Sequence, residues 1–137
     1  MMENYKINFD IPGFKKKLLA HLEKRMESVV VRIVGYVISH FGPSNLGGNN
    51  PSTPGSAPNV GIGTLRNNIS YKVIKDGDVV VGMYGVQKGP ASDYGSRLEM
   101  GFVGTDKAGR NINQLPRPFL APAYKKNMHN IIKWLTI

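Results

Sequence analysis

A run of apolar residues spaced three or four positions apart constrains the fold of this chain more than any other feature. The run comprises Phe14, Leu18, Leu22, Met26, Val29, Ile33, Val37 and Phe41. This spacing places successive side chains on one face of a helix, so the sequence predicts a helix over about residues 13–41. Pro12 suits its first turn. Gly42-Pro43 ends it, because proline lacks an amide hydrogen and restricts the residue before it.

The two halves of this predicted helix differ in character. The first half is amphipathic, with lysine and glutamate residues off the apolar stripe, whereas residues 29–41 are apolar nearly all round and interrupted only by Arg32 among charged residues. A helix that is apolar on most sides is normally enclosed by protein on several sides. In a chain of 137 residues, we expect part of that enclosure to come from neighbouring subunits.

Residues 44–63 are rich in glycine, proline, serine and asparagine and have no hydrophobic period. The composition predicts a long loop. Loops longer than about 12–15 residues inside a compact domain are usually functional or ordered by a partner. Two interpretations stay open: an idle insertion, or a segment that contacts a neighbouring protein.

The remainder of the chain predicts one hairpin and a second helix. Residues 70–75 and 78–86 are rich in valine, isoleucine and tyrosine and flank Asp76-Gly77, a strong hairpin-turn signal. We expect Thr64 to cap a short helical turn before the first strand, and 94–102 to form a helical turn or a third strand. A final helix is predicted from about Ala123 to Leu135. Its expected inner face consists of Tyr124, Met128, Ile131, Ile132 and Leu135.

These elements predict an α+β fold in one domain spanning residues 1–137. The expected architecture is a small antiparallel sheet of three to four strands packed by a long N-terminal helix and a C-terminal helix. A chain of this length buries roughly two thirds of its unfolded surface, which suffices for one core without metals or disulfides. Two separate cores would both be too small.

The sequence offers no constellation typical of an enzyme, and we expect no catalytic activity, cofactor or metal. The chain has no cysteine, which excludes disulfides and thiolate sites. His21, His40 and His129 have no second ligand at a metal-binding spacing. Asp76 and Asp78 are explained by the hairpin turn, where aspartate is favoured for backbone reasons.

The charge of the chain is uneven. The formal net charge is +9, and residues 106–137 carry six basic side chains against the single acidic Asp106. Such an excess serves solubility, or it faces an acidic partner, or it contacts nucleic acid through phosphate without reading sequence. No stretch reaches the roughly 18 apolar residues of a membrane span, and we expect no membrane association.

Three segments occur in a fixed order between the predicted helices: GTLRNNI (63–69), DYGSRLEMG (93–101) and RPFLAPAY (117–124). They resemble the G-x-L-R-x-S-I, Y-A-x-x-V-E-x-G and R-P-F-L-x-P-A segments of the head-tail joining proteins of tailed bacteriophages, described as neck, tail-completion or minor tail components. The resemblance spans most of the chain. Asn68, Gly95 and Phe102 depart from the usual serine, alanine and threonine.

The resemblance implies a structural virion protein, a subunit of the neck or connector ring that joins the DNA-filled head to the tail. It implies a cyclic ring, of six or twelve copies, between head-completion (adaptor) and tail-terminator proteins, with genomic DNA passing through the lumen without sequence-specific contact. The location is the head-tail junction of the virion, after assembly in the host cytoplasm. Two alternatives stay open: a tail terminator capping the tail tube, and a basic, sequence-independent DNA-binding accessory protein.

Six residues are candidates for contacts between subunits or with partner rings. They are Arg66, Tyr94, Glu99, Arg117, Lys125 and Lys126. We expect Arg66 to stay outside the sheet, and Tyr94 and Leu98 to bury. Glu99 is then available to an arginine or lysine of an adjacent subunit, or else it stays within its own subunit or in solvent. The two lysines are expected to face acidic groups, either phosphates of DNA in the channel or, as we favour, carboxylates on a partner ring.

Overall fold

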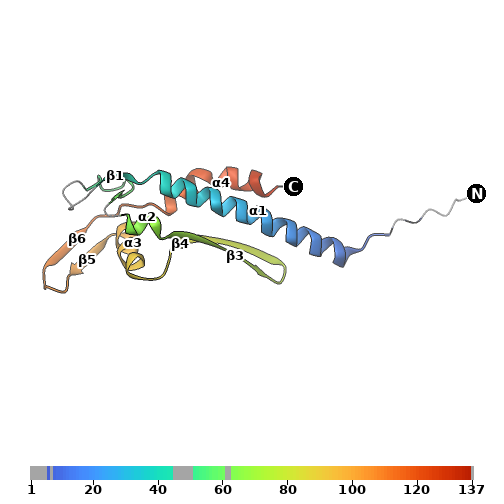
Figure 1. Cartoon of the computed structure of the whole chain (residues 1–137), viewed down its shortest axis with the longest axis horizontal. Coiled ribbons are helices and arrows are strands. Elements are labelled where there is room, and N and C mark those ends of the chain that lie inside the picture. Colours follow the sequence, from blue (N-terminus) through green and yellow to red (C-terminus); the bar gives the residue numbers. More distant parts are fainter. Residues whose placement is uncertain (1–5, 7, 45–50, 61–62, 137) are drawn as a thin grey trace, which may run out of the picture.

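The computed structural model describes residues 6, 8–44, 51–60 and 63–136. Over these residues the chain forms four helices and three pairs of strands in an elongated α+β molecule (Figure 1). The predicted long N-terminal helix and C-terminal helix are both present. In the described residues the strands form three separate two-stranded ladders, where the sequence predicts one sheet of three to four strands.

Helix α1 spans Ile11–Ser39, within two residues of the predicted bounds. The carboxylate of Asp10 caps it by accepting a hydrogen bond from the amide of Gly13 at 3.1 Å. The second half of the apolar stripe lies in the core, where Val29, Ile33 and Val37 are buried. Phe14 is half exposed in the first turn of α1, next to Lys15, which forms an ion pair with Asp78 in the turn of a hairpin.

That hairpin consists of β3 (Ile69–Asp76) and β4 (Val79–Val86), which pair antiparallel over eight residues each. The predicted hairpin is confirmed, with Gly77 at a φ of 57° in the turn. The hairpin lies along α1 (Figure 1). A Cβ atom on Gly82 would lie 2.6 Å from Sδ of Met26 and 2.7 Å from Cγ1 of Val30. The glycine therefore allows the strand to approach the helix closely.

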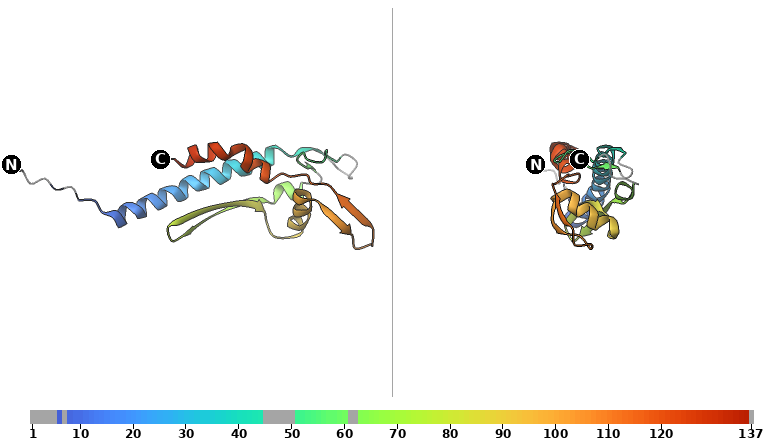
Figure 2. Two further views of the ribbon diagram at one scale, coloured as in Figure 1. Left: turned by 180° about the vertical axis from the view of Figure 1, so that it is seen from behind. Right: turned by 90° about the vertical axis from the view of Figure 1, so that its left-hand side faces the viewer.

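Helix α4 spans Ala121–Leu135 and packs against α1 on a different side from the hairpin (Figure 2). The guanidinium of Arg32 lies 4.8 Å from the ring centre of Trp134, and Arg25 donates to the Trp134 carbonyl at 3.4 Å. These contacts join the two helices. Helix α1 thus forms the middle of the molecule, with α4 on one side and β3–β4 on the other.

The predicted inner face of α4 is partly wrong. Tyr124, Met128 and Ile132 are exposed by 51%, 51% and 65%. The helix instead turns Ala123 and Trp134 toward α1, together with Ile131 and Leu135, which pack on the core. Because α4 touches the rest of the molecule along one side only, part of its broad apolar surface remains outside.

The shorter elements lie at the far end of α1 from its start (Figure 1). They are β1 (Gly42–Ser44), β2 (Asn59–Val60), α2 (Thr64–Asn67), α3 (Pro90–Met100), β5 (Phe102–Thr105) and β6 (Asn111–Gln114). Thr64 does not cap α2, because it already lies in the first turn and Gly63 occupies the capping position. Residues 94–100 are helical, and the hairpin β5–β6 was not predicted.

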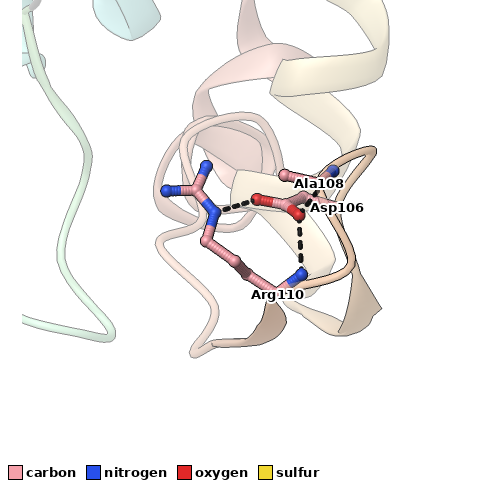
Figure 3. A network of polar contacts seen from close by, with 3 residues as sticks. All are labelled: Asp106, Ala108 and Arg110. Atoms are coloured by element: carbon pink, nitrogen blue, oxygen red, sulfur yellow. Dashed lines mark hydrogen bonds and ion pairs between the residues drawn. The ribbon is translucent and has the colours of Figure 1, made fainter.

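Asp106 organises the turn between β5 and β6 (Figure 3). Its Oδ1 accepts hydrogen bonds from the amides of Ala108 and Arg110, both at 2.9 Å, and its Oδ2 accepts one from Nε of Arg110 at 2.6 Å. The backbone amide of Arg110 is the largest cause that lowers the pKa of Asp106 below its ordinary value. The ionised carboxylate is therefore the form that holds the turn.

We expect this turn to loosen in acid. A carboxyl whose folded pKa is lowered stabilises the fold above its unfolded pKa, about 4, and loses that contribution as pH falls through the folded value. An NMR titration should show Asp106 titrating below pH 4, with the Arg110 amide losing its hydrogen-bonded shift in the same range. Asp106→Asn should abolish that step, and titration of Asp106 at the ordinary carboxyl value would contradict the assignment.

Candidate subunit interface

The three segments 63–69, 93–101 and 117–124 meet in space. Leu65, Leu98 and Phe119 each come from a different segment, and all three belong to one buried cluster. Gly95 lies in its midst: a Cβ atom there would be 3.0 Å from Cδ1 of Leu65 and 3.4 Å from Cζ of Phe119. We call this cluster the junction. The segments that carry the resemblance thus form one packed unit.

Glu99 fastens two of these segments together. Its Oε2 accepts hydrogen bonds from the amides of Phe119 at 2.7 Å and Leu120 at 2.9 Å, and its Oε1 accepts one from the amide of Ala121 at 2.9 Å. These amides lie at the first residue of α4 and just before it. The first amides of a helix have no acceptor within the helix, and this end of a helix favours negative charge. Of the alternatives open for Glu99, the structure shows an intrasubunit role, with backbone amides in place of a basic side chain. We call this contact the Glu99 clamp.

Further hydrogen bonds hold the same stretch of chain. The amide of Arg117 donates to the carbonyl of Leu98 at 2.6 Å, and the hydroxyl of Tyr84 donates to the carbonyl of Leu120 at 2.7 Å. Burial is the main cause that raises the pKa of Tyr84. The sequence gives no signal for this role of Tyr84, which is simply one of the aromatic residues of a strand.

Arg117 also contacts its own subunit. Its Nε donates to the carbonyl of Ser52 at 3.0 Å, and the amide of Gly55 donates to the carbonyl of Pro116 at 2.8 Å. These bonds fasten the described part of the predicted loop, residues 51–60. The rest of that loop, 45–50 and 61–62, lies outside the described residues. A contact between the loop and a neighbouring protein stays a prediction.

Arg66 and Tyr94 both line a pocket of about 350 Å³, which is also lined by Phe41, Leu65 and Ala91. Arg66 is exposed, as expected. The expectation that Tyr94 buries is wrong, although Leu98 is buried. Helix α3 turns Ala91, Gly95 and Leu98 inward, and this spacing leaves Tyr94 on the outer side. The structure therefore unites two of the six candidates on one surface.

Lys125 and Lys126 lie exposed on α4. Neither they nor Lys133 makes a hydrogen bond or ion pair with any described residue. Their charges are thus available to a partner. The candidates form three groups: Glu99 and Arg117 act within the subunit, Arg66 and Tyr94 share a pocket, and the lysines occupy a separate helix face.

None of the helices in the described part of the chain is both long enough and apolar enough to cross a bilayer. Within the same residues, no group of three or more histidine, aspartate or glutamate side chains is placed to hold a metal ion. Comparisons with protein-family models, with curated proteins and with solved structures find no match.

Proposed function

We propose that this chain is a structural subunit of the ring that joins the head of a tailed bacteriophage to its tail. The observation that carries the proposal is the junction. Segments 63–69, 93–101 and 117–124 resemble those of head-tail joining proteins, and they depend on one another through the Glu99 clamp and the packing of Leu65 against Gly95 and Phe119. Three matching segments that pack into one unit are stronger support for a shared function than three short matches that lie apart.

Exposed apolar side chains add support for a protein that works in an assembly. They lie on α1, on α4 and on the face of the β3–β4 hairpin turned away from α1. The main ones are Val31, Ile38, Ile74, Val79, Val81, Met83, Tyr124, Met128 and Ile132. Contiguous exposed apolar surface on a soluble protein commonly marks contacts with other proteins. We propose that these faces contact other copies and the neighbouring head-completion and tail-terminator rings.

The sheet of three to four strands belongs to the assembled state in this proposal. In the described residues β3 and β4 pair only with each other, so each has an outer edge without a partner strand. Free edges are templates for further pairing. A strand from an adjacent copy would extend the hairpin to the predicted size, in a ring of six or twelve copies with DNA in the lumen.

Phage particles made without this protein test the proposal. We expect filled heads and complete tails to accumulate separately, because the proposed role is to join them and not to build either one. Electron microscopy of lysates and plaque counts would measure the effect, and supplying the wild-type chain from a plasmid should restore joined, infectious particles. Normal infectious particles in the absence of the protein would refute the proposal.

The lysates also distinguish this role from that of a tail terminator, and purified protein distinguishes it from that of a DNA-binding accessory protein. A tail terminator would leave tails of irregular length, whereas a neck protein would leave tails of normal length that lack heads. A DNA-binding accessory protein would bind DNA of any sequence in solution, with log affinity falling linearly in log salt. We favour the neck role, for which purified protein need bind DNA only weakly.

A further inference from the structure

The β3–β4 hairpin has an outer face, turned away from α1. Gly82 lies against Met26 and Val30 of α1, so the side chains that alternate with it along the two strands point to the other side. In Figure 1 no described element covers that side near the turn. The solvated face of a hairpin is normally polar. Here its large side chains are mostly apolar and exposed, namely Ile74, Val79, Val81 and Met83. We call this surface the hairpin face.

The hairpin face has opposite charges at its two ends. Lys72 lies two positions before Ile74 on β3, and Asp76 lies two positions after it. The two charged residues are about 13 Å apart along the strand, too far for an ion pair with each other. Neither side chain makes a hydrogen bond or ion pair with a described residue. Beyond the Lys72 end, the nearest charged residues along the chain are Arg66 and Lys88, which are also basic.

The other charges near the turn lie on the side of α1. Asp78 forms an ion pair with Lys15 of α1 at 2.6 Å. Lys75 pairs with Val80, whose side chain is on the inner face of the hairpin together with Gly82. Asp76 is therefore the charge that this end presents on the hairpin face.

The hairpin face is complementary to itself when one copy is turned round. A twofold axis that passes beside Ile74, between two such faces, reverses the direction of β3. Lys72 of one copy then lies opposite Asp76 of the other, and the same pair forms a second time with the copies exchanged. Lys72 is paired with Met83 and Asp76 with Val79 within each hairpin. Met83 of each copy therefore lies opposite Val79 of the other, and the apolar centres meet.

We propose that two copies of this chain pair through their hairpin faces in a twofold dimer. Ile74 and Val81 pack against the same residues of the second copy, with an ion pair at each end of β3. Antiparallel sheets commonly pack face to face in this way, about 10 Å apart. Helix α4 offers no equivalent surface, because it has lysines but no acidic residue. A twofold contact is closed, so association stops at two copies.

The size of the hairpin face sets the strength of the dimer. Two strands of eight residues give a face on the order of 250 Å², about a third of what each partner buries in a standard interface. The dimer is therefore weak, with a dissociation constant that we expect to lie below about 1 mM. Its charges should decide whether it forms, because the apolar contact alone is small.

Exchanging the charges tests the pairing. Lys72→Asp makes both ends of the face acidic, and Asp76→Lys makes both ends basic. We expect each variant alone to dimerise at least about tenfold more weakly than the wild type in sedimentation equilibrium at low salt, because like charges then face each other. An equimolar mixture of the two variants restores both ion pairs, and so does the double variant Lys72→Asp/Asp76→Lys. Both should associate as the wild type does.

Lys75→Asp is the matched control for the charge exchange. It makes the same change of charge on the same strand, but on the inner face, and should dimerise like the wild type. Three results would each overturn the proposal: a wild type that is monomeric at about 1 mM, single variants that dimerise as well as the wild type, or a mixture that stays monomeric.

Cross-linking locates the axis, since the chain has no natural cysteine. Ile74→Cys places one thiol of each copy beside the axis, where a short bismaleimide can join them. Tyr71→Cys is the matched control, because Tyr71 is 41% exposed and Ile74 36%, yet Tyr71 lies on the inner face of the same strand. We expect covalent dimers from Ile74→Cys and few from Tyr71→Cys. Equal yields from the two proteins would refute pairing through the hairpin face.

This dimer is a form of the free protein and goes beyond the proposed ring. A ring between a head and a tail has two different ends, whereas a twofold dimer has equivalent halves. The weak pair therefore separates before the ring assembles. The two proposals can fail separately, because purified protein tests the dimer and phage particles test the ring.

Discussion

Glu99→Ala is expected to lower the free energy of unfolding by about 2–4 kcal/mol. The substitution removes an acceptor that receives three amide hydrogen bonds at the start of α4. Those amides have no alternative side-chain cap, because Leu120 occupies the capping position. It also removes a negative charge from the positive end of the helix. Urea unfolding followed by circular dichroism would measure the loss.

Two comparisons make this result specific to the Glu99 clamp. Glu99→Gln keeps one acceptor oxygen and places an amide group against the remaining donors, so it should lose about half as much stability as Glu99→Ala. Glu23→Ala removes an exposed glutamate that has no ion pair with any described residue, and should change stability by less than about 0.5 kcal/mol. If Glu99→Ala were as stable as Glu23→Ala, the clamp would have no energetic role.

Phe119→Ala is expected to lower the free energy of unfolding by about 3–5 kcal/mol. Phe119 is 4% exposed, and its ring centre lies 5.6 Å from that of Phe41 in a tilted arrangement. Removing the ring leaves a cavity where three segments meet, beside Gly95, which has no side chain to fill it. The loss combines transfer of the ring to water with lost packing around the cavity.

Phe14→Ala is the matched control, since Phe14 is 51% exposed near the start of α1 and contacts only Phe9 among aromatic rings of the described residues. We expect it to lose less than about 1 kcal/mol. Both variants should be measured at a concentration where the protein is monomeric, because association would add to the apparent stability. Similar losses for the two phenylalanines would show that the junction is not the centre of the core.

Hydrophobic spacing was sufficient to predict helices α1 and α4, and residue composition with a turn signal was sufficient to predict the β3–β4 hairpin. The stripe from Phe14 to Phe41 corresponds to α1, and Asp76-Gly77 marks the turn of β3–β4. The inner face of α4 could not be predicted in the same way. Its apolar residues cover more than half of the helix circumference, so their spacing does not say which of them face the core. The position of α1 decides this, and α1 touches Trp134 and leaves Tyr124 outside.

The second hairpin and the Glu99 clamp were missed for different reasons. A signal for β5–β6 was present, since Asp106 and the later Gly109, with a φ of 76°, are typical turn residues. The strands themselves have only four residues each, too few to show a period. Glu99 had no comparable signal, because its partners are backbone amides 20 to 22 positions away, and amides are present at almost every position.

The order in which the chain is synthesised leaves part of the apolar surface of α1 exposed before its partners are made. Val29, Ile33 and Val37 are buried against residues that follow much later, among them Phe119 and Ala123. At about 5–20 residues per second, ribosomes make the intervening 80 or so residues in roughly 4–16 s. The β3–β4 hairpin is complete at Val86, so for the rest of that time only the side of α1 that packs against Phe119 and α4 lacks its partners. The Glu99 clamp, in contrast, closes a loop of only about 20 residues soon after Ala121 is released. We therefore expect chaperones that bind nascent chains to act on this side of α1, and slower translation to prolong its exposure.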